Sequence, residues 1–362
     1  MFNFDIDLGN QCSRNAYNWA KKTFDTRKGR HGEIGMKIDG AFSNALHFGA
    51  ERIGISSDGI GTKIELAERM GIYDTLGFDL LAMTADDLVC AGFIPTNLSN
   101  ILDVDVLDYA IVDQLMRGLH DAAIYTNIAV TGGEIAELGN RIGGYGRQMH
   151  FNWCATAIGT LHPSLSAPID GSRIAVGDAV FAIQSPSFRS NGFSVARRVL
   201  ESHFGADWHH EPHNQGKKWG EILLNPSLIC TPLVLHLLNS GIDIRGVAHI
   251  TGGGIIDNFG RVLKVNRLGA CLDSLFEPLD PMLVLMDKGA LSPEKAYLYW
   301  NMGNALLFVV PSKQAEAVLS LVAPQKTYQV QVAGEITNTP IISLRTKVAN
   351  IDSNYLTESR KI

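Results

Sequence analysis

The stretch Asp58-Gly59-Ile60-Gly61-Thr62-Lys63 decides the fold of this chain. An apolar run, 53–57, precedes it and a helix-like run, 64–70, follows, so the order is strand, acid, glycine turn, lysine, helix. Such a turn can bring backbone N–H groups, a cation and a metal-ligating carboxylate to one anion. It is not a P-loop, which has four residues between its glycines. The pattern favours an α/β fold and leaves open whether the turn is a nucleotide site or an ordinary connection.

The bulk properties indicate a two-domain protein without a nucleic-acid or membrane partner. With 362 residues, the chain exceeds the size of one typical core. Its 46% hydrophobic and 19% charged residues are ordinary for a globular protein, and a net charge of −6 argues against a dedicated nucleic-acid binder. No apolar run has membrane-spanning length. Five scattered cysteines without a CxxC pair, and acids near the N-terminus, predict a cytoplasmic protein with reduced thiols.

A segment rich in Pro, Ser and Gly, 163–177, is the best domain boundary because it carries the turn signal Ile169-Asp170-Gly171-Ser172. We expect a first domain over 1–165, which opens with a partly mobile arm (1–46), a second domain over 172–345, and a polar tail over 346–362. Hydrophobic periodicity predicts strands at 96–102, 127–131, 149–160, 179–183, 242–250, 305–310 and 327–332, and helices at 77–90, 106–125, 193–200 and 255–263.

Acidic residues fall where predicted strands meet glycine turns. Asp58 opens the first glycine loop, Asp103 ends a strand, and Glu134 follows Gly132 and Gly133. Carboxylates at strand ends line the crevice in which α/β folds bind ligands. Each acid alone is as simply explained as a helix cap or a solvated side chain. As a group they favour Mg²⁺, which binds through a few carboxylates and substrate phosphates.

The apolar helix predicted at 77–90 carries further acids. Asp79 and Asp86 lie two helical turns apart and therefore on one face, with Asp87 beside them. Carboxylates on an apolar helix are costly to bury unless a cation pairs with them. These acids are therefore candidates for the same metal site, and Lys63, at the start of the adjacent helix, would balance phosphate charge.

A second glycine loop begins at His249. An apolar strand leads to His249-Ile250-Thr251, and Gly252-Gly253-Gly254 then opens a helix whose first N–H groups are free for an anion. The histidine is either an acid, base or hydrogen-bond donor near neutral pH, or a buried side chain bonded to a carbonyl. The cluster His209-His210-Glu211-Pro212-His213 is not predicted to bind metal, because Pro212 breaks any helical spacing of its ligands.

Taken together, these segments resemble the aminoimidazole ribonucleotide synthetase (phosphoribosylformylglycinamidine cyclo-ligase) family. The resemblance runs from about Asp5 to about Glu335, and it depends on the order and spacing of individually weak motifs. The matching segments are 5–10, 58–63, 77–83, 87–89, 132–134, 169–172, 190–192, 249–254 with Asn258 and Arg261, and 301–303.

The resemblance implies a two-domain α/β fold, in which the N-terminal sheet forms a barrel with that of a second copy and the C-terminal α/β domain packs beside it. It implies an ATP-dependent cyclo-ligase of purine biosynthesis. The enzyme would phosphorylate the formamide oxygen of formylglycinamidine ribonucleotide, and the amidine nitrogen would then close the imidazole ring and expel phosphate.

The resemblance also implies roles for individual residues. His249, Lys63 and Asp87 would be catalytic. The metal, Mg²⁺, would be held by Asp58, Asp86, Asp87 and Glu134. ATP and its phosphates would contact Asp58, Gly59, Gly61, Thr62, Lys63, Gly132 and Gly133. The substrate would face Ser190, Asn191, Gly192, Thr251, Gly252, Gly253 and Gly254.

The chain departs from the family at positions that would touch the substrate. Arg189 stands where the family has the histidine of His-Ser-Asn-Gly, Ile135 replaces the threonine of Gly-Gly-Glu-Thr, and Leu228 replaces the arginine of Pro-Thr-Arg. Arginine for histidine removes a proton carrier and adds a fixed charge. Two alternatives therefore stay open: a paralogous ATP-dependent enzyme of the same superfamily with a different phosphate acceptor, and a non-catalytic nucleotide-binding subunit.

Overall fold

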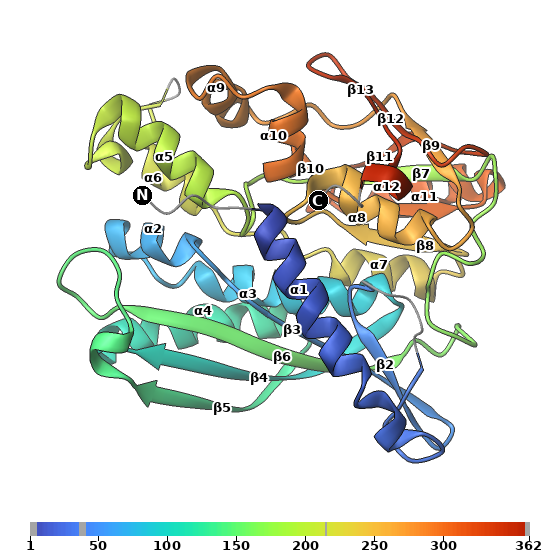
Figure 1. Ribbon diagram of the computed structural model, residues 1–362, viewed down its shortest axis with the longest axis horizontal. Helices are drawn as coiled ribbons and strands as arrows, with labels where there is room; N and C mark the ends of the chain where they lie inside the picture. The colour runs from blue at the N-terminus through green and yellow to red at the C-terminus, as the bar shows by residue number, and fades with distance from the viewer. Residues whose placement is uncertain (1–5, 36–40, 214–215, 359–362) are drawn as a thin grey trace.

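The structure, a computed structural model, describes residues 6–35, 41–213 and 216–358, and it divides into two α/β units, each built on its own sheet (Figure 1). The first sheet has six strands; β4 and β5 are parallel and the other neighbours are antiparallel. In spatial order its strands are β1 (Glu33–Ile34), β2 (Asn44–Phe48), β3 (Glu51–Gly59), β6 (Phe151–Leu161), β4 (Phe93–Val104) and β5 (Ala129–Glu137).

The second sheet has seven strands, of which only β12 and β9 are neighbours in parallel. Its central strands β7 and β10 are almost wholly buried, since apolar side chains cover both of their faces. In spatial order the strands are β13 (Asn350–Ser353), β12 (Ile342–Arg345), β9 (Gly269–Leu272), β11 (Val330–Thr337), β7 (Ala179–Gln184), β10 (Asn304–Val310) and β8 (Gly246–His249).

Helices accompany both sheets, and none in the described part of the chain is long and apolar enough to cross a membrane. The helices of the first unit are α1 (Ile6–Lys21), α2 (Lys63–Met70), α3 (Leu76–Cys90) and α4 (Tyr109–Thr126). Those of the second unit are α5 (Phe193–Phe204), α6 (Trp219–Leu224), α7 (Thr231–Asn239), α8 (Gly254–Leu263), α9 (Asp280–Lys288), α10 (Pro293–Tyr299), α11 (Ala315–Val322) and α12 (Tyr355–Glu358).

Local sequence accounts for the helices that position the site. Asp108 caps α4 by accepting hydrogen bonds from the N–H groups of Ala110 and Ile111, and Asn127 ends the helix in the left-handed region. Helix α3 packs so closely on α4 that a Cβ on Gly77 would lie 2.2 Å from the backbone carbon of Gly118. Glycine at these positions therefore permits the close approach. Figure 1 shows α3 and α4 on the face of the first sheet that is turned toward the second unit.

The structure revises three sequence predictions. Strand β5 runs through Gly132 and Gly133, where we predicted a strand end, because β4 continues beside it to Val104. The predicted arm, 1–46, contains α1, β1 and the first residues of β2 in its described part, and β2 pairs with β3. The predicted tail, 346–362, contributes β13 to the second sheet. Asp5, at the start of the family resemblance, lies outside the described residues.

Helix α3 joins the two units. Its Asp79 accepts a hydrogen bond from the Lys63 ammonium at 2.8 Å and from the Ser227 N–H at 3.1 Å. Lys63 also donates to the Asn225 carbonyl at 2.8 Å, and both charged side chains are 0% exposed. Burial lowers the pKa of Lys63 and raises that of Asp79, while the pairing opposes both shifts. At its other end, α3 places Val89 in the apolar cluster of the second unit.

The Lys63–Asp79 pair predicts a double-mutant result. Lys63→Met or Asp79→Leu alone leaves an uncompensated buried charge and should destabilise the protein by about 3–5 kcal/mol. The double variant should recover most of this loss, as measured by chemical unfolding. Arg117→Met is the matched control, because Arg117 pairs with Asp74 at 3.5 Å with side chains 55% and 44% exposed. It should change stability by less than about 1 kcal/mol. A double variant as unstable as the sum of the single ones would contradict the pairing.

Candidate functional site

The candidate site lies where the end of β3 meets α3, β8 and α8. Asp58 is the penultimate residue of β3 and accepts a hydrogen bond from the Gly59 N–H at 2.7 Å. Ser56, two residues earlier and therefore on the same face of the strand, lies 3.4 Å from Asp87 of α3. The strand thus turns a hydroxyl and a carboxyl toward the acids of the helix.

Asp58 and Asp87 form an electrostatically coupled pair. Burial, and to a smaller extent the charge of Asp87, raise the pKa of Asp58 to about 6, while the hydrogen bond from the Gly59 N–H opposes the shift. Burial raises the pKa of Asp87 to about 8; Arg261 of α8 opposes this shift and Asp86 adds to it. Two partly buried carboxyls whose pKa values are raised by burial and by neighbouring acids bind a proton or a metal cation favourably.

His249 is fully buried between Asp87 and Arg189. Its Nδ1 lies 2.7 Å from Asp87 Oδ1, and its Nε2 lies 2.8 Å from the Arg189 guanidinium. Burial, and then the charge of Arg189, lower the pKa of His249 to about 3. The imidazole is therefore neutral at pH 7, and both of its nitrogens are occupied within the protein.

The hydrogen-bond partners of the Asp86 carboxylate all come from the second unit. Its carboxylate pairs with Arg189 at 2.9 Å and accepts hydrogen bonds from the N–H groups of Cys230 and Thr231 at 2.9 and 2.8 Å. The Thr231 hydroxyl donates a further bond at 2.9 Å. With 0% exposure and this set of donors, Asp86 has no oxygen left for the metal that we predicted it to bind.

The two predicted substrate loops lie next to each other. A Cβ on Gly252 would lie 3.6 Å from the side-chain nitrogen of Asn191. The Ser190 hydroxyl and Asn191 Oδ1 are buried without a hydrogen-bond partner among the described residues. The loop from Thr251 is less open than predicted, because the N–H groups of Gly253 and Gly254 already donate to Leu298 and Thr251. These amides are not free for an anion.

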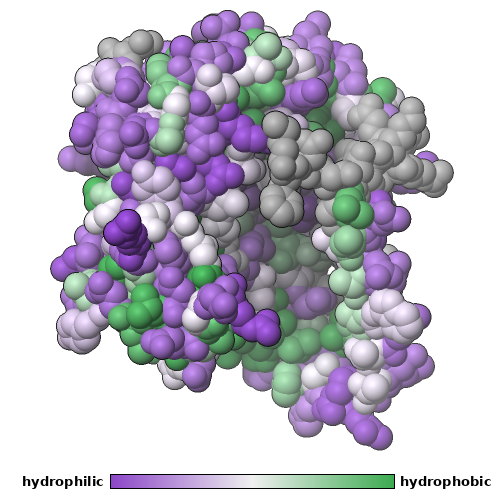
Figure 2. Space-filling model, turned by 60° about the vertical axis from the view of Figure 1, so that its left-hand side comes forward, coloured by the Kyte–Doolittle hydropathy of each residue, from purple (hydrophilic) through white to green (hydrophobic). Residues whose placement is uncertain are grey.

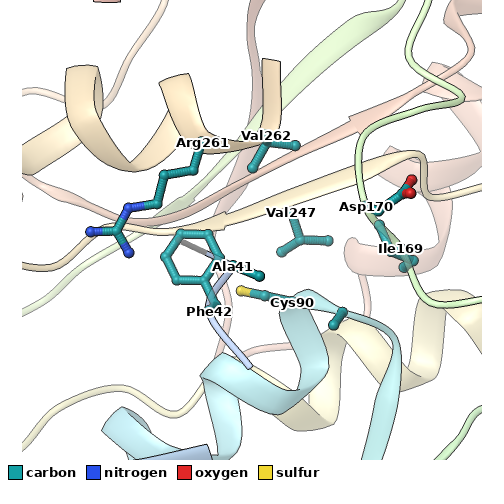
Figure 3. Close-up of a pocket in the computed structure, with 9 residues that line it drawn as sticks. Ala41, Phe42, Cys90, Ile169, Asp170, Val247, Arg261 and Val262 are labelled. Carbon is teal, nitrogen blue, oxygen red and sulfur yellow. The ribbon is translucent and has the colours of Figure 1, made fainter. Parts of the chain in front are cut away.

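A small cavity of about 30 Å³ adjoins this site, and Figure 3 shows the residues that line it. Phe42 and Arg261 lie together on one side, with the guanidinium carbon 5.2 Å from the ring centre, and Asp170 lies on the opposite side. The Phe42 ring is also 6.4 Å from that of His249. Cys90 lines the cavity, but burial raises the pKa of its thiol well above the ordinary value, so it is not a nucleophile.

Comparison with known proteins identifies the family. Residues 43–161 match the family described as "AIR synthase related protein, N-terminal domain". Residues 175–347 match the one described as "AIR synthase related protein, C-terminal domain". The phosphoribosylformylglycinamidine cyclo-ligase of Thermococcus kodakarensis is 32% identical over 317 residues, or 88% of this chain and 89% of that protein. That of Pyrococcus furiosus is 32% identical over 321 residues, or 89% of each. The chain belongs to the AIR synthase related family.

Solved structures show the same fold at lower identity. A HypE–HypF complex matches with a TM-score of 0.62 and 14% identity, over 85% of this chain and 91% of that chain. A thiamine-monophosphate kinase from Stenotrophomonas maltophilia matches with a TM-score of 0.61 and 16% identity, over 91% of this chain and 96% of that chain. The two-domain α/β architecture is therefore common to the AIR synthase related family and to these proteins.

Within one chain of this AIR synthase related protein, the other predicted site residues do not lie together with Asp58 and Asp87. Lys63 is committed to Asp79 and Asn225, so it does not reach a phosphate. Gly132, Gly133 and Glu134 lie on the edge strand β5, three strands from Asp58 in the sheet order. The glycines are held in the β4–β5 ladder rather than in a turn. Within the described ranges, no three His, Cys, Asp or Glu side chains are placed to hold a metal ion.

The first loop is open only at its second glycine, because the Gly59 and Ile60 N–H groups already donate to Asp58 and to the Trp153 carbonyl. Gly59 and Gly61 flank Ile60, Gly61 has φ 72° with open space where a Cβ would be, and Thr62 lies at the start of α2 without a side-chain cap. Sequence reasoning gave no role to Ser56 or Phe42. Arg261 appeared only as a matching residue of the family motif, and its position on α8 after the glycine loop was the available signal.

The raised pKa of Asp87 predicts a pH-dependent stability difference. The folded protein holds this proton up to about pH 8, whereas the ordinary pKa of an aspartate is 3.8. The contribution of this carboxyl is therefore full below about pH 4 and is lost as the pH rises through about 8. Relative to the wild type, Asp87→Asn should gain stability between pH 5 and pH 9 in magnesium-free buffer. Denaturant midpoints measure this difference, and Asp113→Asn on the exposed face of α4 is the control. A pH-independent difference would contradict the shift.

Proposed function

We propose that this protein is a cytoplasmic, ATP-dependent cyclo-ligase that converts formylglycinamidine ribonucleotide to aminoimidazole ribonucleotide, with ADP and phosphate as the other products. The observation that carries the proposal is the 32% identity, over 88% of the chain, to an enzyme named for this reaction. Asp58, Asp87 and Arg261 supply groups of the kind that such a reaction needs, namely carboxylates for a cation and a guanidinium for anionic oxygens.

ATP would bind at the loop that follows β3. The open space at Gly61 would let phosphate oxygens approach the backbone of Gly61 and Thr62 at the start of α2. Asp58 and Asp87 fit a magnesium ion, because their coupled charges favour a cation and Mg²⁺ takes its other oxygens from phosphates and water. When bound, that ion would neutralise phosphate charge during transfer to the formamide oxygen.

The substrate would face Ser190, Asn191 and the loop from Thr251 to Gly254. The unpartnered oxygens of Ser190 and Asn191 are available to a polar ligand. His249 would act by holding Asp87 rather than by carrying a proton, since both of its nitrogens are engaged. The second candidate, phosphoryl transfer to a different acceptor, is favoured by Arg189, which stands at the family's histidine position.

We also propose that the protein is a homodimer that pairs the open face of its first sheet. The strands alternate so that one face of β4 and β6 is buried and the other is exposed. Figure 1 shows no helix on that other face among the described residues. It carries Ile101 (48% exposed) and Ile158 (41% exposed). Figure 2 shows hydrophobic side chains on the lower part of the molecule, whereas the upper part is mainly hydrophilic.

The enzymatic proposal is tested with purified protein, ATP, Mg²⁺ and formylglycinamidine ribonucleotide, by measuring ADP and aminoimidazole ribonucleotide together. Asp58→Asn should lower kcat on the order of 100-fold, as loss of one transition-state charge contact does. Asp113→Asn should keep the wild-type rate. ADP formation with another acceptor, but without the aminoimidazole product, would favour the paralogous enzyme, and no ATP binding would favour the non-catalytic subunit.

The dimer is tested by light scattering after size-exclusion chromatography. Ile101→Glu combined with Ile158→Lys should convert a dimer to a monomer, because charges would replace apolar side chains on the paired face. Ile124→Glu is the control, because Ile124 is 70% exposed on α4, away from that face. A wild-type monomer at micromolar concentration would refute the proposal.

A further inference from the structure

Arg189 occupies an unusual and closely constrained position. Its φ of 61° lies in the left-handed region, which residues other than glycine rarely adopt, and its side chain is 1% exposed. The guanidinium Nη2 lies 2.9 Å from Asp86 Oδ2 and 2.8 Å from His249 Nε2, and Nη1 donates to the Ala305 carbonyl at 3.4 Å. Such backbone strain persists where surrounding contacts over-determine the conformation.

Hydrogen-bond chemistry fixes the proton of His249. A guanidinium has donors and no acceptor, so His249 Nε2 must accept from Arg189. In a neutral imidazole the proton then resides on Nδ1. That N–H points at Asp87 Oδ1, 2.7 Å away, and donates to it. Because Arg189 can only donate, it fixes the direction of the hydrogen bonds from Arg189 to His249 and from His249 to Asp87.

Neutralisation of Asp86 does not by itself explain this geometry. Asp86 already accepts two backbone N–H groups and the Thr231 hydroxyl. The Arg189 nitrogen that reaches Asp86 is the one that also reaches His249, so the guanidinium is aimed between the helix and β8. Of these four side chains, Asp86 and His249 are 0% exposed and Arg189 is 1% exposed, whereas Asp87 is 15% exposed.

We propose that Arg189 is a positioning residue that holds His249 as the Nδ1–H tautomer and thereby fixes the orientation of Asp87 in the crevice. Asp86 anchors the guanidinium, Arg189 assigns the histidine proton, and His249 holds the carboxylate. The arginine thus performs through hydrogen bonding a role that needs no proton transfer at residue 189. The effect of this positioning on turnover rests on the proposed function, but the tautomer itself does not.

The tautomer is measured on the full-length protein labelled with ¹⁵N-histidine, by two-bond ¹H–¹⁵N correlation spectra, with His249→Gln used to assign the ring. We expect wild-type His249 to be protonated at Nδ1 and unprotonated at Nε2. Arg189→Gln and Arg189→Met both remove the charge beside Asp86, but only glutamine keeps an N–H donor. Arg189→Gln should retain the Nδ1–H form, and Arg189→Met should populate the Nε2–H form.

These outcomes separate positioning from mere structural support. The two variants should lose similar stability, since both leave Asp86 without its cation, and yet differ in tautomer. In the cyclo-ligase assay, kcat of Arg189→Met should fall about 10- to 100-fold below that of Arg189→Gln, as loss of a supporting partner does, with KM for ATP unchanged. A wild-type Nε2–H form, an imidazolium, or equal Nδ1–H populations in both variants would overturn the proposal. If Arg189→Met does not fold, the wild-type spectrum alone decides. Absence of cyclo-ligase activity would instead refute the proposed function and leave the tautomer result standing.

Discussion

The burial of three carboxylates on one helix is the constraint on which this structure depends. Asp79, Asp86 and Asp87 of α3 are all turned toward the second unit, and each meets different donors there or at its own edge. A buried charge without a partner costs several kcal/mol, so loss of one partner alone should destabilise the contact between the two units. The apolar contacts of α3 supply affinity, and the carboxylates fix the register in which the units meet.

The three acids differ in how many hydrogen bonds and ion pairs they receive. The candidate site lies at Asp87, which receives the fewest. Asp79 is paired with a lysine and bonded to a backbone N–H, and Asp86 is paired with an arginine and bonded to two such groups. Asp87 has a neutral imidazole at 2.7 Å and a hydroxyl at 3.4 Å, and the repulsion of Asp86 opposes the attraction of Arg261. A carboxyl with weak partners, partial exposure and a raised pKa is suited to bind a ligand rather than to support the fold.

The sequence was most informative where a pattern is local. The order around Asp58 predicted β3 and α2, and the two-turn spacing of Asp79 and Asp86 correctly placed them on one helix face. It could not show which charges would meet. Lys63 lies 162 residues from Asn225, and Arg189 lies 103 residues from Asp86, so these pairings depend on how the two units pack. A lysine after a glycine turn favours a phosphate role on local grounds, but here packing commits it to Asp79.

The same reasoning explains how the chain tolerates arginine at residue 189. Inserting a fixed charge beside β8 would ordinarily be costly, because the site excludes water. Asp86 is already present on α3 and balances that charge, and the same guanidinium nitrogen donates to a second acceptor, His249 Nε2. The Arg189 guanidinium therefore contacts Asp86 and His249 rather than the Asp58–Asp87 pair. Asp58 and Asp87 stay available to a cation while His249 is held neutral. Both hold together because Arg189 pairs with Asp86, whereas Asp87 contacts the neutral His249.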